Sequence, residues 1–245
     1  MLRRLALCSG ALLALGTATP QATALSFSLS PTTLQLDPAR RLTTFTTFRN
    51  LDRTPVEFTV EVVRWSQVDG KDVLEPTDEV VVNPVRFTLK PGGSQIIRLG
   101  VRKKPDRPEM TYRLLVRQQR PTTDVPTTTP APGTSRVNII RLLNLSLPVS
   151  VASAESRPDM RYSLQRQDQN LVLQLSNAGS RHEALRSLTV EGGGRTMKVD
   201  NKAVLAGSTV SVVLPGWGTA MGPLHLSFTD HLGKGQRVSA QVPSP

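Results

Sequence analysis

The chain has 245 residues, of which 38% are hydrophobic and 20% charged, and these proportions are typical of a soluble globular protein. They exclude a chain that is disordered throughout, and no segment beyond the N-terminal region has the ~20 apolar residues that a membrane-spanning helix needs. The single cysteine, Cys8, excludes an intramolecular disulfide and a cysteine-based zinc site. Thirty Lys and Arg against nineteen Asp and Glu give a formal charge of +11, which raises the question of a nucleic-acid or anionic partner.

Residues 1–24 have the pattern of a secretory signal peptide. Arg3 and Arg4 precede the apolar run Leu5–Leu15, and the segment ends in the small-x-small pattern that a signal peptidase cuts, here after Ala24. We therefore expect a mature protein outside the cytoplasm, without stable membrane insertion, because so short an apolar run does not span a bilayer. Cleavage would remove the two arginines and the cysteine and lower the formal charge from +11 to +9. The alternative is a buried N-terminal helix.

The mature chain has the alternation of apolar and polar residues that is typical of half-buried strands. Val56–Val62 alternates valine and phenylalanine with glutamate and threonine, which places one row on a core and the other in water. No comparable run has the helical period. About a dozen short strands separated by turn residues predict an all-β protein, and two seven-stranded immunoglobulin-like sandwiches fit that number better than one barrel. The same period recurs at Val85–Leu89, Ile97–Val101, Tyr112–Val116, Leu171–Leu175, Leu224–Phe228 and Val238–Val242.

Two segments indicate where the chain divides. Pro121–Ser135 holds four prolines and six threonines, a composition that favours an extended mobile loop over a helix or a central strand. The longest apolar stretch of the mature chain follows it, and then a polar segment at 152–158. We therefore expect the loop to lie within the first domain, before its last strand, and predict domains over 25–150 and 151–245.

Several segments together resemble the periplasmic pilus-assembly chaperones of the chaperone-usher pathway. Phe87–Leu99 (FTLKPGGSQIIRL) resembles a strand-turn-strand of that family, and Tyr112–Arg117 resembles the strand that follows. Leu171–Leu188, with its Asn-Ala-Gly turn, and Val204–Thr209 resemble strands of the C-terminal domain. The resemblance spans nearly the whole mature chain. It implies two immunoglobulin-like sandwiches set at an angle, no enzymatic activity, no cofactor, and two partners: pilin-like subunits and an outer-membrane usher.

The resemblance also implies a donor strand over residues 136–149. A pilin that lacks its last strand exposes a hydrophobic groove and unpaired backbone groups, which a strand supplied by another protein covers. The segment RVNIIRLLNLSLPV is apolar on both faces at its centre, more than a strand with one solvated face requires. The alternative is a central sandwich strand whose outer face is covered by the second domain. The residues expected to enter the groove are Val137, Ile139, Ile140, Leu142, Leu143 and Leu145.

In this family a basic residue of the donor strand and an arginine of the first strand anchor the carboxylate at the pilin C-terminus. Counting back from Pro148, the basic position falls on Arg141, and a guanidinium suits bidentate carboxylate binding. The alternative for Arg141 is an internal ion pair or a position at the sheet edge. The first strand departs from the family, since Pro31, Thr32 or Thr33 stands where the arginine is expected. The disulfide that some relatives have in the C-terminal domain is absent too, which indicates a divergent branch.

Other kinds of site are not supported by the sequence. His182-Glu183 begins like the zinc-binding helix of metalloproteases, but Arg186 stands in place of the second histidine and the pattern is that of a strand. We expect the three histidines to be scattered and exposed or half-buried, and no metal site. The positive charge is spread over both halves without interleaved aromatics, so we expect no nucleic-acid partner. The alternative function is a secreted adhesive or structural protein of immunoglobulin-like domains, which needs neither donor strand nor anchor.

Overall fold

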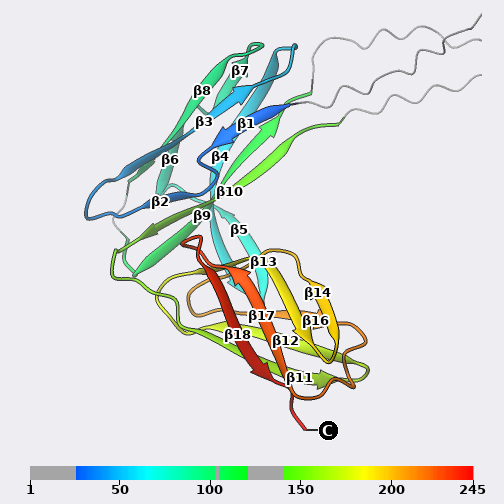
Figure 1. Ribbon diagram of the computed structural model, residues 1–245. Helices are drawn as coiled ribbons and strands as arrows, with labels where there is room; N and C mark the ends of the chain where they lie inside the picture. The colour runs from blue at the N-terminus through cyan, green and yellow to red at the C-terminus, as the bar shows by residue number, and fades with distance from the viewer. Residues whose placement is uncertain (1–25, 103–104, 121–140, 245) are drawn as a thin grey trace, which may run out of the picture.

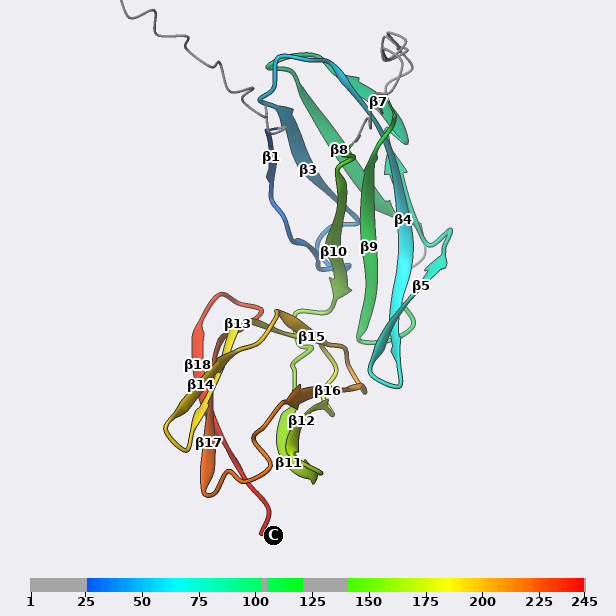
Figure 2. The same cartoon turned by 90° about the vertical axis from the view of Figure 1, so that its right-hand side faces the viewer.

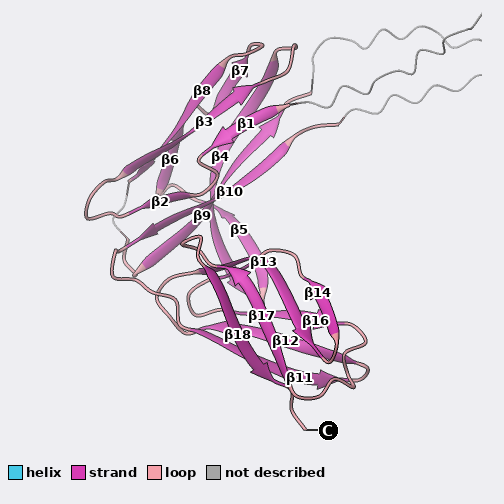
Figure 3. Cartoon of the chain, viewed as in Figure 1, coloured by secondary structure: helices cyan, strands magenta, loops and turns pink. Residues whose placement is uncertain are grey.

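The computed structural model describes residues 26–102, 105–120 and 141–244, and these residues form strands and loops without a helix (Figures 1 and 3). The all-β prediction is therefore confirmed, and nothing in the described residues is a helix that could cross a membrane. The predicted signal peptide, the loop at 121–135 and the donor residues Val137, Ile139 and Ile140 lie outside the described residues.

The first sandwich contains strands β1 to β10. One sheet has the order β1-β3-β8-β6, and the other has the order β2-β10-β9-β4-β5, with β7 also paired to β4. This is the arrangement of an immunoglobulin-type sandwich, in which a sheet of four strands faces a second sheet built around three long strands, here β4, β9 and β10. The strands are β1 (Phe27–Ser30), β2 (Leu34–Leu36), β3 (Thr43–Asn50), β4 (Val56–Val68), β5 (Lys71–Pro76), β6 (Val80–Asn83), β7 (Arg86–Leu89), β8 (Ser94–Val101), β9 (Glu109–Gln118) and β10 (Asn144–Ala152).

The core of the first sandwich follows from the alternation seen in the sequence. Val56, Phe58, Val60 and Val62 of β4 are all buried, while the residues between them face outward. Phe58 lies at the centre of an aromatic cluster, with ring centroids 4.8 Å from Phe48 and 5.7 Å from Phe87. Packing of this kind adds to the free energy gained by burying apolar area, so the cluster holds the two sheets together.

The second sandwich contains strands β11 to β18 around a separate core. A three-stranded sheet with the order β11-β12-β16 faces a sheet with the order β14-β13-β17-β18, to which β15 adds through β13. Its core is formed mainly by leucines, including Leu171, Leu173 and Leu175 of β12, and by Trp217. The strands are β11 (Met160–Gln167), β12 (Asn170–Asn177), β13 (Glu183–Gly192), β14 (Arg195–Lys198), β15 (Lys202–Val204), β16 (Thr209–Leu214), β17 (Pro223–Thr229) and β18 (Gly235–Gln241).

The two sandwiches follow one another and are set at an angle (Figures 1 and 2). The chain passes from the end of β10 at Ala152 to the start of β11 at Met160 through a short connection beside the junction. The turn between β4 and β5 reaches past the first sandwich and lies against the second (Figure 2). Gln67 of β4 donates to the carbonyl oxygen of Ala203 at 2.9 Å and accepts from the N–H of Leu205 at 2.9 Å. The backbone of the second sandwich is thereby fixed to the first.

Candidate functional site

The last strand of the first sandwich is paired along only part of one edge. On one side β10 pairs antiparallel with β9 along its whole length, from Asn144 opposite Arg117 to Ala152 opposite Glu109. On the other side the short strand β2 pairs only with Val149, Ser150 and Val151. Among the described residues, no strand pairs with the first half of β10 on that side. This half therefore presents a free strand edge.

The orientation of the backbone determines which groups lie on the free edge. The N–H of Gln118 donates to the carbonyl oxygen of Leu143, and the N–H of Ser153 donates to that of Pro108. Since bonding alternates along an antiparallel pair, odd-numbered residues of β10 bond to β9 and even-numbered residues face the other way. The backbone N–H and C=O groups of Asn144 and Ser146 are therefore directed at the free edge. Pro148 also faces this side, so its missing N–H leaves the ladder to β9 intact.

The observed strand differs from the predicted donor strand at both ends. Residues 141–143 precede the strand, and it continues past the predicted end at 149 to Ala152. The strand extends further because Val149 and Val151 are fully buried in the core and Ser150 bonds to Glu109. Pro148 therefore lies within the strand, which ends four residues after it.

The side chains of β10 become less buried toward its free end. Val149 is 1% exposed and Leu147 5%, whereas Leu145 and Leu143 are only partly buried against the same core. Phe27 and Leu29 of β1, on the opposite sheet, are partly buried there as well. The sandwich is therefore incompletely covered where β1 and β10 form the edges of their sheets, and apolar side chains are available beside the free backbone groups.

Arg141 lies three residues before β10 and is exposed. Among the described residues, no carboxylate lies within ion-pair distance of it. Ala152, where β10 meets the second sandwich, is at the opposite end of the strand. Arg141 therefore belongs to the outer end of the free edge, and Leu142, also before the strand, is partly buried.

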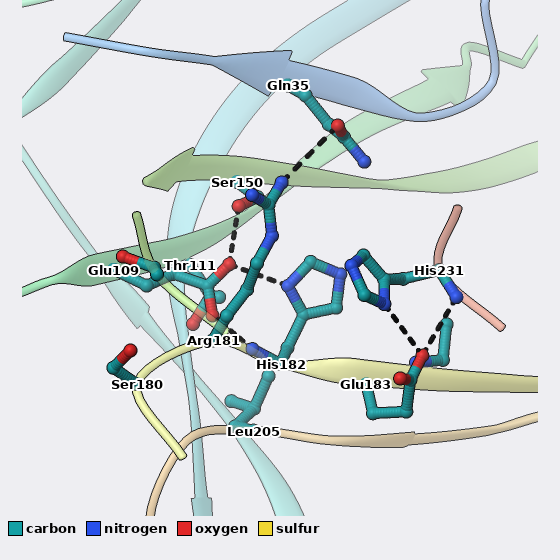
Figure 4. Close-up of polar contacts among 12 residues, drawn as sticks. Gln35, Glu109, Thr111, Ser150, Ser180, Arg181, His182, Glu183, Leu205 and His231 are labelled. Carbon is teal, nitrogen blue, oxygen red and sulfur yellow. Dashed lines mark hydrogen bonds and ion pairs between the residues drawn. The ribbon is translucent and has the colours of Figure 1, made fainter. Parts of the chain in front are cut away.

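At the inner end of β10, a buried carboxylate joins the two sandwiches (Figure 4). Glu109 of β9 accepts hydrogen bonds from the hydroxyl of Ser150, from the backbone N–H of His182 and from His182 Nδ1, the last at 2.6 Å. Burial alone would raise the pKa of the Glu109 carboxyl, but these bonds together outweigh burial and hold the pKa below its ordinary value. The ionised carboxylate is thus a structural link between β9, β10 and the second sandwich.

A second buried carboxylate–histidine pair lies next to the first. Glu183 accepts from the backbone N–H of His231 at 2.8 Å and contacts its ring Nδ1 at 2.9 Å. The rings of His182 and His231 have centroids 5.9 Å apart and lie side by side in Figure 4. The prediction of scattered, exposed or half-buried histidines is wrong for His182, which is buried and lies beside His231 because each ring contacts a buried glutamate. His231 is half-buried as a residue, as predicted, and so is His225, which bonds to Ser239 on an exposed face.

The junction also contains arginines that the sequence did not indicate as binding residues. A pocket of about 370 Å³ lies between the sandwiches, lined by Pro31 and Thr33, in the segment where the resemblance predicts an arginine, and by Arg41 and Arg186. Neither arginine has a carboxylate of the described residues within ion-pair distance; the guanidinium of Arg41 donates to the carbonyl oxygen of Gln35 at 3.3 Å. The pocket lining contains no acidic residue. It can therefore accept a carboxylate from another molecule.

A third arginine borders this region. Arg181 donates to the side-chain oxygen of Gln35 at 3.3 Å, and its Nε is buried without an acceptor among the described residues. These arginines come from segments far apart in the sequence. The only available signal was the departure at residues 31–33, which shows that a basic group is missing from the first strand but not what replaces it.

Comparison with known proteins relates this architecture to one class of solved structures. No family model matches the sequence, and no curated protein matches it either. The chain is similar to a chain of the CsuC–CsuE chaperone–tip adhesion subunit pre-assembly complex from archaic chaperone-usher Csu pili of Acinetobacter baumannii. That match has a TM-score of 0.67 and 19% identity and covers 89% of this chain and 100% of the other.

Two further structures are similar over the same extent. The YadV chaperone matches with a TM-score of 0.63 and 12% identity, over 88% of this chain and 99% of the other. The complex of the Salmonella enterica SafA pilin with the SafB chaperone matches with a TM-score of 0.62 and 13% identity, over 90% and 98%. The chain therefore has the two-sandwich fold of the chaperone-usher pilus chaperones. At these identities the likeness is one of fold.

Proposed function

We propose that this protein is a divergent periplasmic pilus-assembly chaperone, a non-enzymatic protein that binds a pilin-like subunit by donating β10 to it and passes it to an outer-membrane usher. The observation that carries the proposal is the free edge of β10 at Asn144 and Ser146, next to the partly exposed Leu143 and Leu145. The shared fold supports the proposal, since several of the similar structures are complexes of such chaperones with a pilin or tip adhesin.

The edge has the two features that strand donation requires. The backbone N–H and C=O groups of Asn144 and Ser146 supply hydrogen bonds to a strand of the subunit, and the leucines supply apolar surface to its groove. Residues Val137, Ile139, Ile140 and Leu142, N-terminal to the strand, extend the apolar segment in the sequence. We propose that they continue the contact with the subunit beyond the end of β10.

A carboxylate anchor is available at either end of the strand. Arg141 offers an exposed guanidinium at the outer end, and Arg41 and Arg186 line the junction pocket at the inner end. A subunit has one C-terminal carboxylate, so it occupies one of these places. We propose Arg141, which the family pattern indicates, as the anchor, and the junction pocket, which adjoins the residues 31–33 where the arginine is missing, as the alternative place.

The test is coexpression in the periplasm with pilin-like subunits from the same genome, followed by purification through a tag on this chain. The expected result is a one-to-one complex and a subunit that is degraded or aggregates when this chain is absent. Subunits that stay soluble and stable without this chain would contradict the proposal.

Two proline variants, which remove backbone N–H groups on opposite sides of β10, make the test more specific. Ser146→Pro removes an N–H that faces the free edge, so we expect the fold to be retained, as it is at Pro148, and the complex to be weakened. Leu145→Pro removes an N–H that bonds to β9 and is expected to destabilise the sandwich itself. Arg141→Glu and Arg186→Glu then distinguish the two candidate anchors. Only the charge reversal at the true anchor should abolish the complex while the protein stays folded.

The alternative, a secreted adhesive or structural protein of immunoglobulin-like domains, makes a different prediction for the same variants. Such a protein has no use for an unpaired strand edge, so Ser146→Pro would not alter its binding.

A further inference from the structure

The outer face of the β1-β3-β8-β6 sheet has an exposed apolar patch at its centre. Phe45 of β3 lies opposite Arg98 of β8, and Ile96 and Gly100 follow on either side of Arg98 along the same face. Val81 of β6 lies opposite Gly100. Phe45 is 54% exposed, Ile96 37% and Val81 36%. Single exposed apolar residues are common, but a group that shares neighbouring positions of one sheet face often marks an interaction site.

Gly100 leaves a gap of about the size of a methyl group within this patch. A Cβ atom placed on it would lie 3.5 Å from Val81 Cγ2 and 3.9 Å from Thr43 Cγ2, which is ordinary van der Waals contact. The register of β3 and β8 is regular across the position, so the glycine does not form a bulge. A glycine in a strand that neither packing nor geometry requires often marks the close approach of another molecule.

The charge on this face has one sign. Arg49 and Arg98 are exposed, and neither has a carboxylate of the described residues within ion-pair distance. The remaining outward positions of the four strands are uncharged, namely Ser28, Ser30, Thr43, Thr47, Asn83 and Ser94. A partner that complements the face therefore carries carboxylates beside apolar side chains.

We propose that this face, defined by Phe45, Arg49, Val81, Ile96, Arg98 and Gly100 and called the β3/β8 face, binds an acidic protein segment with apolar side chains between its carboxylates. A protein segment fits better than an anionic lipid surface, because a peptide can approach the strand closely at Gly100, which has no side chain, whereas a lipid surface needs no such position. The β3/β8 face lies on the sheet opposite β10, so both surfaces are accessible at once. The proposal does not depend on strand donation.

The test uses three synthetic peptides of equal length with the complete mature chain. In the first, leucine and phenylalanine alternate with glutamate; in the second, lysine replaces glutamate; in the third, serine replaces the apolar residues. Binding is measured by titration, and the site is mapped by the backbone amide shifts of the isotope-labelled protein. Only the first peptide is expected to bind, with the shifts concentrated on β3, β6 and β8.

Three variants and two matched controls complete the test. Phe45→Ser and Arg98→Glu are each expected to weaken binding about tenfold, and Gly100→Ala is expected to weaken it while leaving the unfolding transition unchanged or higher. Val213→Ser and Lys234→Glu, at exposed positions of the second sandwich, are expected to bind like the unaltered chain. Equal binding of the lysine peptide, no binding of the first peptide, or shifts along β10 would overturn the proposal. A lipid surface is tested with vesicles of phosphatidylglycerol and phosphatidylethanolamine. If the chain binds these vesicles but no peptide, and Phe45→Ser and Arg98→Glu abolish the vesicle binding, the proposal is overturned in favour of a lipid surface.

Discussion

Glu109 of the first sandwich and His182 of the second form a buried pair in which the carboxylate accepts from both the backbone N–H and the imidazole of the histidine. Their side chains are 1% and 8% exposed. The same carboxylate accepts from Ser150 of β10, the strand whose outer half is free. One buried carboxylate therefore links the second sandwich to both β9 and β10.

Replacing that group should loosen the junction. Glu109→Ala leaves the N–H of His182 and the hydroxyl of Ser150 buried without an acceptor, which should cost about 1–3 kcal/mol of unfolding free energy. Chemical denaturation measures this loss, and solution scattering should show a broader range of interdomain distances. Glu155→Ala, at an exposed position of the connection, serves as the control. A Glu109→Ala chain with unaltered stability and scattering would show that the carboxylate does not hold the junction.

The same carboxylate predicts a dependence of stability on pH. The pKa of Glu109 is lowered in the folded protein from its ordinary value of 4.5, so the unfolded chain binds more protons near and below that value. The stabilisation is complete above the ordinary pKa and is lost as the pH falls through the folded-state pKa. Denaturation from about pH 7 to about pH 3 should therefore show a shallower acid loss in Glu109→Gln than in the unaltered chain. Glu155→Gln is the matched control and should lose stability in acid like the unaltered chain. An equal loss of stability in acid for Glu109→Gln and the unaltered chain would contradict the prediction.

The contact of the β4–β5 turn with the second sandwich can be tested at Gly70. Its φ of +73° is in the left-handed region, and a Cβ atom there would lie 3.0 Å from the carbonyl oxygen of Thr209. Gly92 has a φ of +68° with nothing within 4 Å, so Gly92→Ala measures the backbone strain alone, about 1 kcal/mol. Gly70→Ala should destabilise the protein more than Gly92→Ala in the same denaturation experiment. Equal effects would mean that the turn adapts to the methyl group.

The aromatic cluster gives a prediction for the first sandwich. Phe58 is fully buried between Phe27, Phe48 and Phe87, so Phe58→Ala should lower the unfolding free energy by about 3–5 kcal/mol. Phe45→Ala, at an exposed position of the neighbouring sheet, should change it by less than about 1 kcal/mol. The comparison is made by denaturation. Similar losses in the two variants would show that Phe58 is not the centre of the core.

Much of the fold could be predicted because each strand contains its own signal. The alternation at Val56–Val62 predicted which residues of β4 are buried, and the same reasoning located β9, β12 and β17 to within a few residues. The eighteen strands of the described residues exceed the dozen expected, because short strands such as β2 and β15 have too few residues to show a period. The predicted end of this strand, at residue 149, was wrong. The strand continues because Val151 is buried, and that burial depends on the opposite sheet.

The junction could not be predicted because its residues are distant in the sequence. Glu109 and His182 are 73 positions apart and belong to different sandwiches, so neither spacing nor local pattern connects them. The arginines of the junction pocket are equally distant in the sequence, since Arg41 and Arg186 line one pocket only when the two sandwiches pack. Strand signals are local, whereas this part of the site is made by tertiary contacts.

The central claim is that the outer half of β10 is free until a subunit pairs with it, and amide hydrogen exchange at single residues tests it most directly. In the free protein, the amides of Asn144 and Ser146 should exchange rapidly, while those of Leu145 and Leu147, which bond to β9, should be protected. Addition of a pilin-like subunit should protect Asn144 and Ser146 and leave the two leucines protected as before. Protection of Asn144 and Ser146 already in the free protein, or rapid exchange that persists in a purified complex, would contradict strand donation by β10.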